Sequence, residues 1–310
     1  MPLDPNIRAM LDQLAAAEAK PLEEVGVEEA RAQIRLLSLL DGEAEPVAAA
    51  HDVTLPGPAG PIPVRVYRPA GAPDGPLPVL VWYHGGGWVI GDLESGDPTA
   101  RKMANRTGAL TVSVDYRLAP EHRAPAAADD GFAVVEWLAG HAGELGGDPS
   151  RLAVGGDSAG GNVAAVSAQR AAAAGIELRA QALFYPVIDA RRETPSYVEN
   201  ADGYLLTAAS MAWFVDHYLG PNGRADDPAV SPILAKSLAG LAPAIVVTAG
   251  FDPLRDEGIA YADRLGADGV KVRHLHYDDM IHGFVVMASI TPRTDEALTT
   301  VAGDVRDLLS

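Results

Sequence analysis

The stretch VGGDSAGGNVAAV (residues 154–166) places one serine among glycines, between an apolar run and an alanine-rich run. The apolar run predicts a strand, and the run over 159–174 has helical character. Ser158 lies at the junction, with Gly156 before it and Gly160 after it. A nucleophile there must project its hydroxyl from a turn so sharp that neighbouring side chains would collide, which explains the glycines. The alternative is a small residue in a glycine-rich loop.

The rest of the chain repeats the same alternation of short apolar runs and helical segments. A parallel sheet is typical of repeated β–α order, and runs that are apolar throughout are typical of strands buried on both faces. We therefore predict an α/β fold with a mostly parallel central sheet flanked by helices. The expected strands are 79–83, 110–114, 152–154, 182–185, 245–248 and 272–277, and the expected helices are 126–140, 159–174, 254–267 and 294–309.

Two segments depart from this alternation. Residues 51–69 show two alternating runs around a Pro/Gly turn, which predicts an antiparallel hairpin at a sheet edge. Residues 190–225 are too long for a simple crossover and contain a helical run over 205–219. No linker divides the chain, so we expect a single domain over 1–310, with a helical cap formed by about 1–45 and 190–225.

The composition excludes several classes of function. A formal net charge of −18 would repel nucleic acid and anionic membranes, so neither is an expected partner. The chain has no cysteine, which excludes disulfides and thiolate chemistry. Charged residues interrupt the first twenty positions, which do not read as a signal peptide. No apolar run reaches the roughly 18 residues that a bilayer span needs. We expect a cytoplasmic protein without a metal or other cofactor, because no metal-ligand cluster or dinucleotide fingerprint occurs.

A serine nucleophile needs donors for the oxyanion that its attack creates. His84-Gly85-Gly86-Gly87-Trp88 follows the strand at 79–83. Its glycines allow backbone amides to line a pocket, together with the amide of Ala159 after the serine. The alternatives are a flexible loop or a phosphate cradle, but the loop lacks the Walker ending and the G-x-G-x-x-G spacing.

The serine also needs an acid and a base. Asp252 follows the strand at 245–248, whereas Asp256 and Glu257 fall in the next helix, where acids favour the helix dipole. We therefore prefer Asp252.

His282 lies in a loop after the last strand and before a glycine, and it follows the acid in the chain. His274 and His276 lie inside that strand on one face, where histidines are more often structural, so we prefer His282 as the base.

These residues lie in motifs that resemble the hormone-sensitive lipase family of α/β-hydrolases, the family IV bacterial esterases. The motifs are HGGGW (84–88), VDYRLAPEH (114–122), GDSAGGN (156–162), DPLRDEG (252–258) and HGF (282–284). The resemblance implies an α/β-hydrolase fold, a Ser158–His282–Asp252 triad and an oxyanion hole of Gly85, Gly86, Gly87 and Ala159. It also implies that residues 116–121 support the oxyanion loop, and it is compatible with a homodimer through the last strand and the 294–309 helix.

We expect a carboxylesterase that hydrolyses small esters of short or medium acyl chain through an acyl-enzyme. The alternatives are an amidase or arylformamidase on the same scaffold, and a ligand-binding relative without catalysis. Asp157 receives no role. Candidates for the substrate pocket, each of which also fits a core position, are Trp88, Tyr185, Leu205, Met211, Trp213, Phe214 and Ile281.

Overall fold

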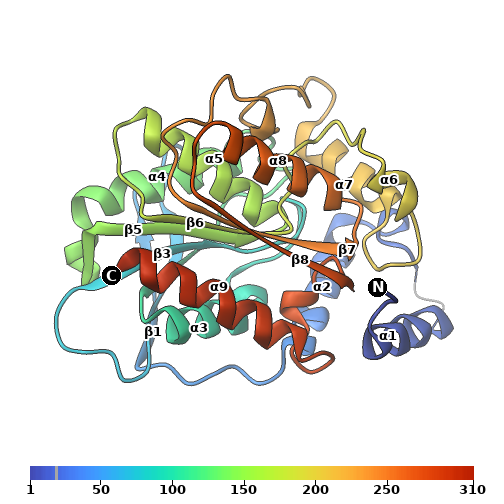
Figure 1. Cartoon of the computed structure of the whole chain (residues 1–310), viewed down its shortest axis with the longest axis horizontal. Helices are drawn as coiled ribbons and strands as arrows, with labels where there is room; N and C mark the ends of the chain where they lie inside the picture. Colours follow the sequence, from blue (N-terminus) through green and yellow to red (C-terminus); the bar gives the residue numbers. More distant parts are fainter. Residues whose placement is uncertain (18–19) are drawn as a thin grey trace.

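The computed structural model describes residues 1–17 and 20–310, and its centre is one eight-stranded sheet (Figure 1). The strand order is β1-β2-β4-β3-β5-β6-β7-β8. β1 and β2 form the predicted hairpin, β2 pairs antiparallel with β4, and every later pair is parallel. The strands are β1 (Ala49–Leu55), β2 (Ile62–Arg68), β3 (Leu77–Tyr83), β4 (Leu110–Val114), β5 (Gly147–Asp157), β6 (Ala180–Phe184), β7 (Ala244–Phe251) and β8 (Val272–Ile281).

Helices cover both faces of the sheet, as Figure 1 shows. α4 (Ala126–His141), α5 (Ala159–Ala173) and α8 (Arg255–Ala267) lie on one face, and α3 (Leu93–Thr107) and α9 (Arg293–Leu309) lie on the other. The side chains of β3 show how the sheet feeds two cores, because successive residues point to opposite faces. Val79 and Val81 join one buried cluster, whereas Leu80 and Trp82 join the other. The predicted fold class is confirmed.

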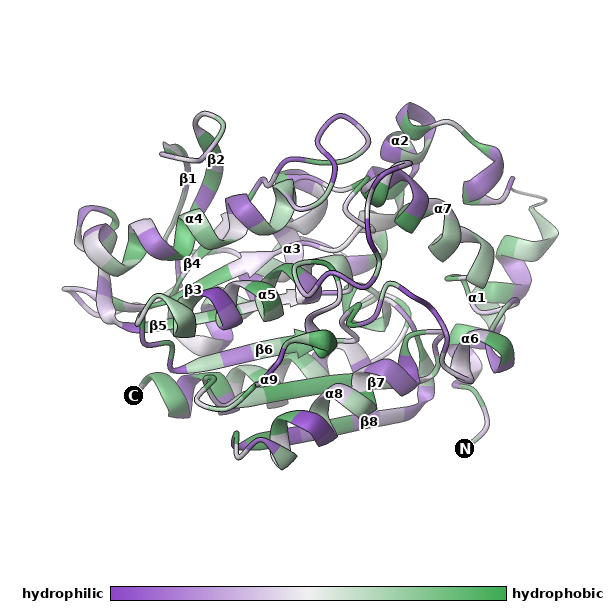
Figure 2. Cartoon of the chain, turned by 90° about the horizontal axis from the view of Figure 1, so that it is seen from above, coloured by the Kyte–Doolittle hydropathy of each residue, from purple (hydrophilic) through white to green (hydrophobic). Residues whose placement is uncertain are grey.

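The remaining helices gather at the end of the sheet where the parallel strands terminate. They are α1 (Pro5–Ala16), α2 (Val27–Leu37), α6 (Ser196–Glu199) and α7 (Ala208–Leu219), and they lie together at the right of Figures 1 and 2. Loops that follow parallel strands converge at this end, which is where α/β proteins carry their chemistry. No helix within residues 1–17 and 20–310 is long and apolar enough to cross a membrane.

The sequence patterns did not predict α3, and its buried face explains why. Asp97 and Lys102 are buried there beside Leu93, Ala100 and Met103, so polar residues interrupt the apolar stripe that would reveal a helix. Lys102 pairs with Asp41, and both side chains are almost fully buried. The helix is nevertheless well capped: Asp92 and Ser95 form a capping box, and Gly108 ends the helix in the left-handed conformation.

Candidate active site

Ser158 occupies the sharp turn between β5 and α5. Its φ of 56° and ψ of −119° put a non-glycine residue in a strained region of backbone space. A Cβ on Gly156 would lie 2.5 Å from the carbonyl oxygen of Tyr83, and one on Gly160 would lie 2.0 Å from the same oxygen. Only glycine therefore fits two positions before and two positions after the serine, because β3 runs directly beside the turn, with Tyr83 paired to Gly156.

Two hydrogen bonds connect Ser158, His282 and Asp252. His282 Nε2 lies 2.9 Å from Ser158 Oγ, and His282 Nδ1 lies 2.8 Å from Asp252 Oδ2. Since a carboxylate only accepts, Nδ1 donates to Asp252, and Nε2 is left to accept the serine O–H. The other oxygen of Asp252 accepts the N–H of Leu254 at 2.8 Å, which fixes the fully buried carboxyl group. Three strand ends thus bring a hydroxyl, an imidazole and a carboxylate into hydrogen-bond contact.

The rival acids and histidines have other partners. Asp256 accepts the amide of Ser196, and Glu257 accepts the amides of Ile188 and Asp189. Burial raises the pKa of Glu257 well above its usual range. These two acids hold the chain at the first residue of α6 and in the segment before it.

Both strand histidines, His274 and His276, lie at hydrogen-bond distance from the Thr248 hydroxyl, at 2.8 and 2.9 Å. They therefore belong to a polar group between β7 and β8, apart from the Ser158–His282 pair.

The glycine loop after β3 lies against the nucleophile turn. Gly85 donates its N–H to Asp157 Oδ1 at 3.0 Å, so this amide is already engaged. The amides of Gly86, Gly87 and Ala159 have no acceptor among the residues that the structure describes. Of the four predicted oxyanion donors, these three are the free ones.

Residues 116–121 contact this loop from behind. The Tyr116 hydroxyl donates to the carbonyl oxygen of His84 at 2.7 Å, and the two rings stack with centroids 4.5 Å apart. His84 Nδ1 lies 2.7 Å from the carbonyl oxygen of Gly85, to which it donates. Burial lowers the pKa of His84, which favours the neutral ring.

Asp157 is the residue of this site that sequence reasoning missed. Its carboxylate lies beside the nucleophile and holds the first amide of the glycine loop. A Cβ on Gly85 would lie 2.3 Å from Asp157 Oδ2, so the contact also requires glycine at that position. No local pattern gives this role, because Gly85 is 72 residues away in the chain.

Four of the predicted pocket residues divide into two groups. The Phe214 ring lies against Gly87, since a Cβ there would be 2.1 Å from its Cδ1, and the Tyr185 ring has its centroid 4.5 Å from that of His282. Trp88 stacks on Tyr218 at 4.3 Å and, like Ile281, has no accessible surface. Trp88 and Ile281 are thus as buried as Tyr185, which is 1% exposed, and their contact with a substrate stays a prediction.

Three other predicted pocket positions lie in or near α7. Leu205 is 38% exposed just before the helix. Met211 is buried in the core, and Trp213 packs partly buried against it.

Comparison with known proteins is consistent with this geometry. A family model described as the α/β hydrolase fold matches residues 80–286, about two thirds of the chain. The chain belongs to the hormone-sensitive lipase family of α/β hydrolases. The family predicted from the motifs is therefore confirmed.

Relatives within the hormone-sensitive lipase family match almost end to end. The carboxylesterase NlhH of Mycobacterium tuberculosis is 44% identical over 95% of this chain and 92% of its own length. The ethyl acetate hydrolase of Pseudomonas putida is 37% identical over 97% of this chain and 98% of its own. The crystal structure of a hyperthermophilic esterase from Pyrobaculum calidifontis superposes with a TM-score of 0.91 at 41% identity, covering 99% of both chains. This member of the family is a serine carboxylesterase, as predicted.

Proposed function

We propose that Ser158 is the nucleophile of this esterase, His282 its general base and Asp252 the acid that orients the base. The observation that carries the proposal is the pair of hydrogen bonds of 2.9 and 2.8 Å that links the three side chains in that order. His282 accepts the serine proton as Oγ attacks the ester carbonyl, and then gives it to the leaving alcohol. Water hydrolyses the acyl-enzyme by the same proton path in reverse.

The oxyanion of each tetrahedral intermediate is stabilised by the amides of Gly86, Gly87 and Ala159. Their freedom from other acceptors supports this assignment, and the engagement of Gly85 with Asp157 argues against a fourth donor. Ala159 is also the first residue of α5, whose N-terminal end favours negative charge. The loss of one such donor typically costs about a hundredfold or more in turnover.

The substrate class that we propose is a small uncharged ester of short or medium acyl chain. The side chains that we propose to contact the substrate are Tyr185, Phe214 and Leu205, with Phe214 packed directly on Gly87. Phe214 comes from α7, so we infer that residues 190–225 act with about 1–45 as a cap over the strand ends. The name of the Pseudomonas relative, an ethyl acetate hydrolase, supports a short ester. The cytoplasmic location and the homodimer stay predictions.

The experiment is a series of p-nitrophenyl esters from acetate to palmitate, together with p-nitroacetanilide as the matched amide. We expect kcat/KM to peak at a short or medium chain and amide turnover to be far slower. A maximum at palmitate would overturn the substrate class, and amide turnover equal to that of the ester would favour the amidase alternative. Ser158→Ala should abolish turnover of every substrate.

A further inference from the structure

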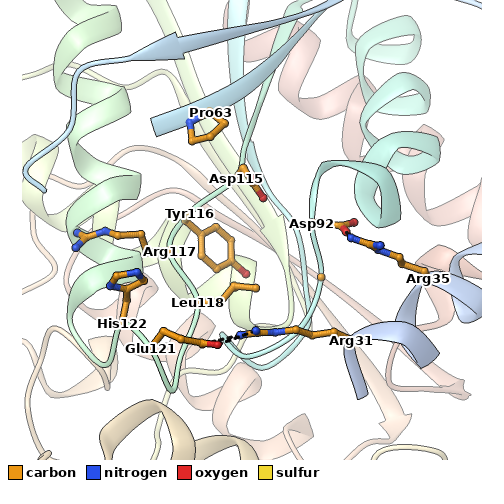
Figure 3. Close-up of a pocket in the computed structure, with 11 residues that line it drawn as sticks. Arg31, Arg35, Pro63, Asp92, Asp115, Tyr116, Arg117, Leu118, Glu121 and His122 are labelled. Carbon is orange, nitrogen blue, oxygen red and sulfur yellow. Dashed lines mark hydrogen bonds and ion pairs between the residues drawn. The ribbon is translucent and has the colours of Figure 1, made fainter. Parts of the chain in front are cut away.

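Arg31 of α2 reaches from the N-terminal helices to the back of the glycine loop. Its Nε donates to the carbonyl oxygen of Val89 at 3.0 Å, and its Nη2 donates to that of Ala119 at 3.1 Å. The same guanidinium binds both oxygens of Glu121, at 2.9 and 2.8 Å. Figure 3 shows Arg31 extending from its helix to Glu121, where both line a cavity that contains none of the side chains proposed to contact the substrate.

These contacts add to the hydrogen bonds that hold the glycine loop, residues 84–88, against the segment 118–121. The carbonyl oxygen of Gly86 accepts the N–H groups of Val89 and Ile90, which makes residues 86–90 a tight turn. The N–H of Ala119 donates to the carbonyl oxygen of Trp88 at 2.8 Å, which joins this turn to the segment 118–121. Arg31 donates to the carbonyl oxygen of Val89 in the turn and to that of Ala119 in the segment 118–121, so it links the two. The turn that it holds begins with Gly86 and Gly87, the two glycines proposed as oxyanion donors.

The interaction depends on the shape and the charge of the guanidinium. Val89 and Ala119 are fully buried, and Arg31 donates a hydrogen bond to the carbonyl oxygen of each, so removing Arg31 takes a donor from both oxygens. A planar fork of five N–H donors serves two carbonyls and a carboxylate at once, which an ammonium group cannot do. The hydrogen bond to Arg31 lowers the pKa of Glu121 to about 2, so the pair stays charged throughout the working range of a serine esterase.

We propose that Arg31 is a positioning residue for the oxyanion hole, through which α2 fixes the amides of Gly86 and Gly87. The inference rests on the proposed function of those amides. It gives α2 a supporting role in catalysis, although α2 lies outside the residues 80–286 matched by the family model and contributes no group to the reaction itself.

The test is Arg31→Ala, compared with Arg170→Ala. Arg170 is a matched control because it also binds a carbonyl oxygen and a carboxylate, those of Ala128 and Asp129, at 3.2 and 2.8 Å. Its side chain is 28% exposed, against 25% for Arg31. It lies twelve residues beyond Ser158 on α5, roughly 18 Å along the helix. Both variants should lower the melting temperature, which is measured first so that kinetics are run well below it.

At that temperature we expect Arg31→Ala to lower kcat and kcat/KM together by about tenfold or more for p-nitrophenyl acetate, because the interaction acts on the transition state. KM should stay within about threefold, and Arg170→Ala should keep the kcat of the unmodified chain. An unchanged kcat in Arg31→Ala, a change in KM alone, or an equal loss of kcat in Arg170→Ala would overturn the proposal.

If Arg31→Ala does not fold, Arg31→Lys tests whether Arg31 positions the amides. Lysine keeps the charge but can serve only part of the set of acceptors, so kcat should be lowered with KM nearly unchanged. Full kcat in Arg31→Lys would overturn the proposal. An unmodified chain that neither turns over the ester nor is labelled at Ser158 by a fluorophosphonate would refute the proposed function itself, a result distinct from loss of the Arg31 effect.

Discussion

The carboxylate of Asp157 accepts the N–H of Gly85 at 3.0 Å, and this bond joins the nucleophile turn to the glycine loop. Asp157 precedes Ser158, and Gly85 precedes the two glycines with free amides. Since the proposed nucleophile and the proposed oxyanion donors must be held at a fixed separation, we expect this one side chain between them to set the geometry of both.

We expect Asp157→Ala to lower kcat by about tenfold, because the glycine loop loses its inner attachment. Asp157→Asn keeps an oxygen that can accept the Gly85 amide, so its kcat should stay within about threefold of the unmodified chain. Steady-state kinetics on p-nitrophenyl acetate separate the two variants. Equal activity of Asp157→Ala and the unmodified chain would show that the bond does not position the loop.

Asp157 also predicts a dependence of stability on pH. Burial raises the pKa of Asp157 to about 6 from a usual 3.8, although His282 and the Gly85 amide act to lower it. The other titratable groups that interact with this carboxyl are Tyr116, Tyr185 and Asp41. The folded state thus holds the proton more tightly than the unfolded state. Stability from this group is fully present below about pH 4 and is lost as pH rises through 6.

Asp157→Asn should therefore stabilise the protein more at pH 8 than at pH 4, by at most about 3 kcal/mol. Urea unfolding at the two pH values measures the difference. The prediction fails if the variant shifts the free energy of unfolding equally at both.

Gly160→Ala should be severely destabilising. The added Cβ would lie 2.0 Å from the carbonyl oxygen of Tyr83 and 2.5 Å from that of His84, and neither backbone can move without disturbing β3. We expect a loss of more than about 3 kcal/mol, or no folded protein. Gly140→Ala is the control, because that glycine is also helical but has nothing within 4 Å of its added Cβ. It should gain about 0.5–1 kcal/mol in thermal or urea unfolding. Similar unfolding of the two variants would contradict the steric argument.

Lys102→Met should cost about 3–5 kcal/mol, because it leaves the buried carboxyl of Asp41 without its cation. Lys102 also donates to the backbone carbonyl oxygen of Asp41 at 2.9 Å, and Thr99 donates to the carboxyl. The double variant Asp41→Asn, Lys102→Met should recover part of the loss, since no buried charge is left. A double variant that is less stable than Lys102→Met would mean that the single loss does not come from the unpaired carboxylate. Differential scanning calorimetry gives both values.

The sequence predicted those features that depend on residues close together in the chain. Glycine on either side of Ser158, and an acid and a histidine after their strands, reflect needs of the turn and the reaction, and these residues do converge. Helix α3 did not show a pattern, because its buried face carries polar residues whose partners lie elsewhere in the chain.

Arg31 was missed for a related reason. Apart from Glu28, which is three residues away on the same helix, its acceptors lie 58 to 90 residues away, and only the folded chain brings them to the guanidinium. For Trp88, the sequence could not distinguish a pocket position from a core position, because an apolar residue beside the site fits both. Its stacking on Tyr218 depends on the folded chain.

The most direct test of the account is the reaction of the chain with a fluorophosphonate, followed by intact-mass measurement and peptide mapping. We predict one adduct per chain, on Ser158, no adduct in Ser158→Ala, and slower labelling in His282→Ala, because the serine then has no base. The result that would contradict the account is an adduct on another residue, or none on Ser158 in a preparation that hydrolyses esters.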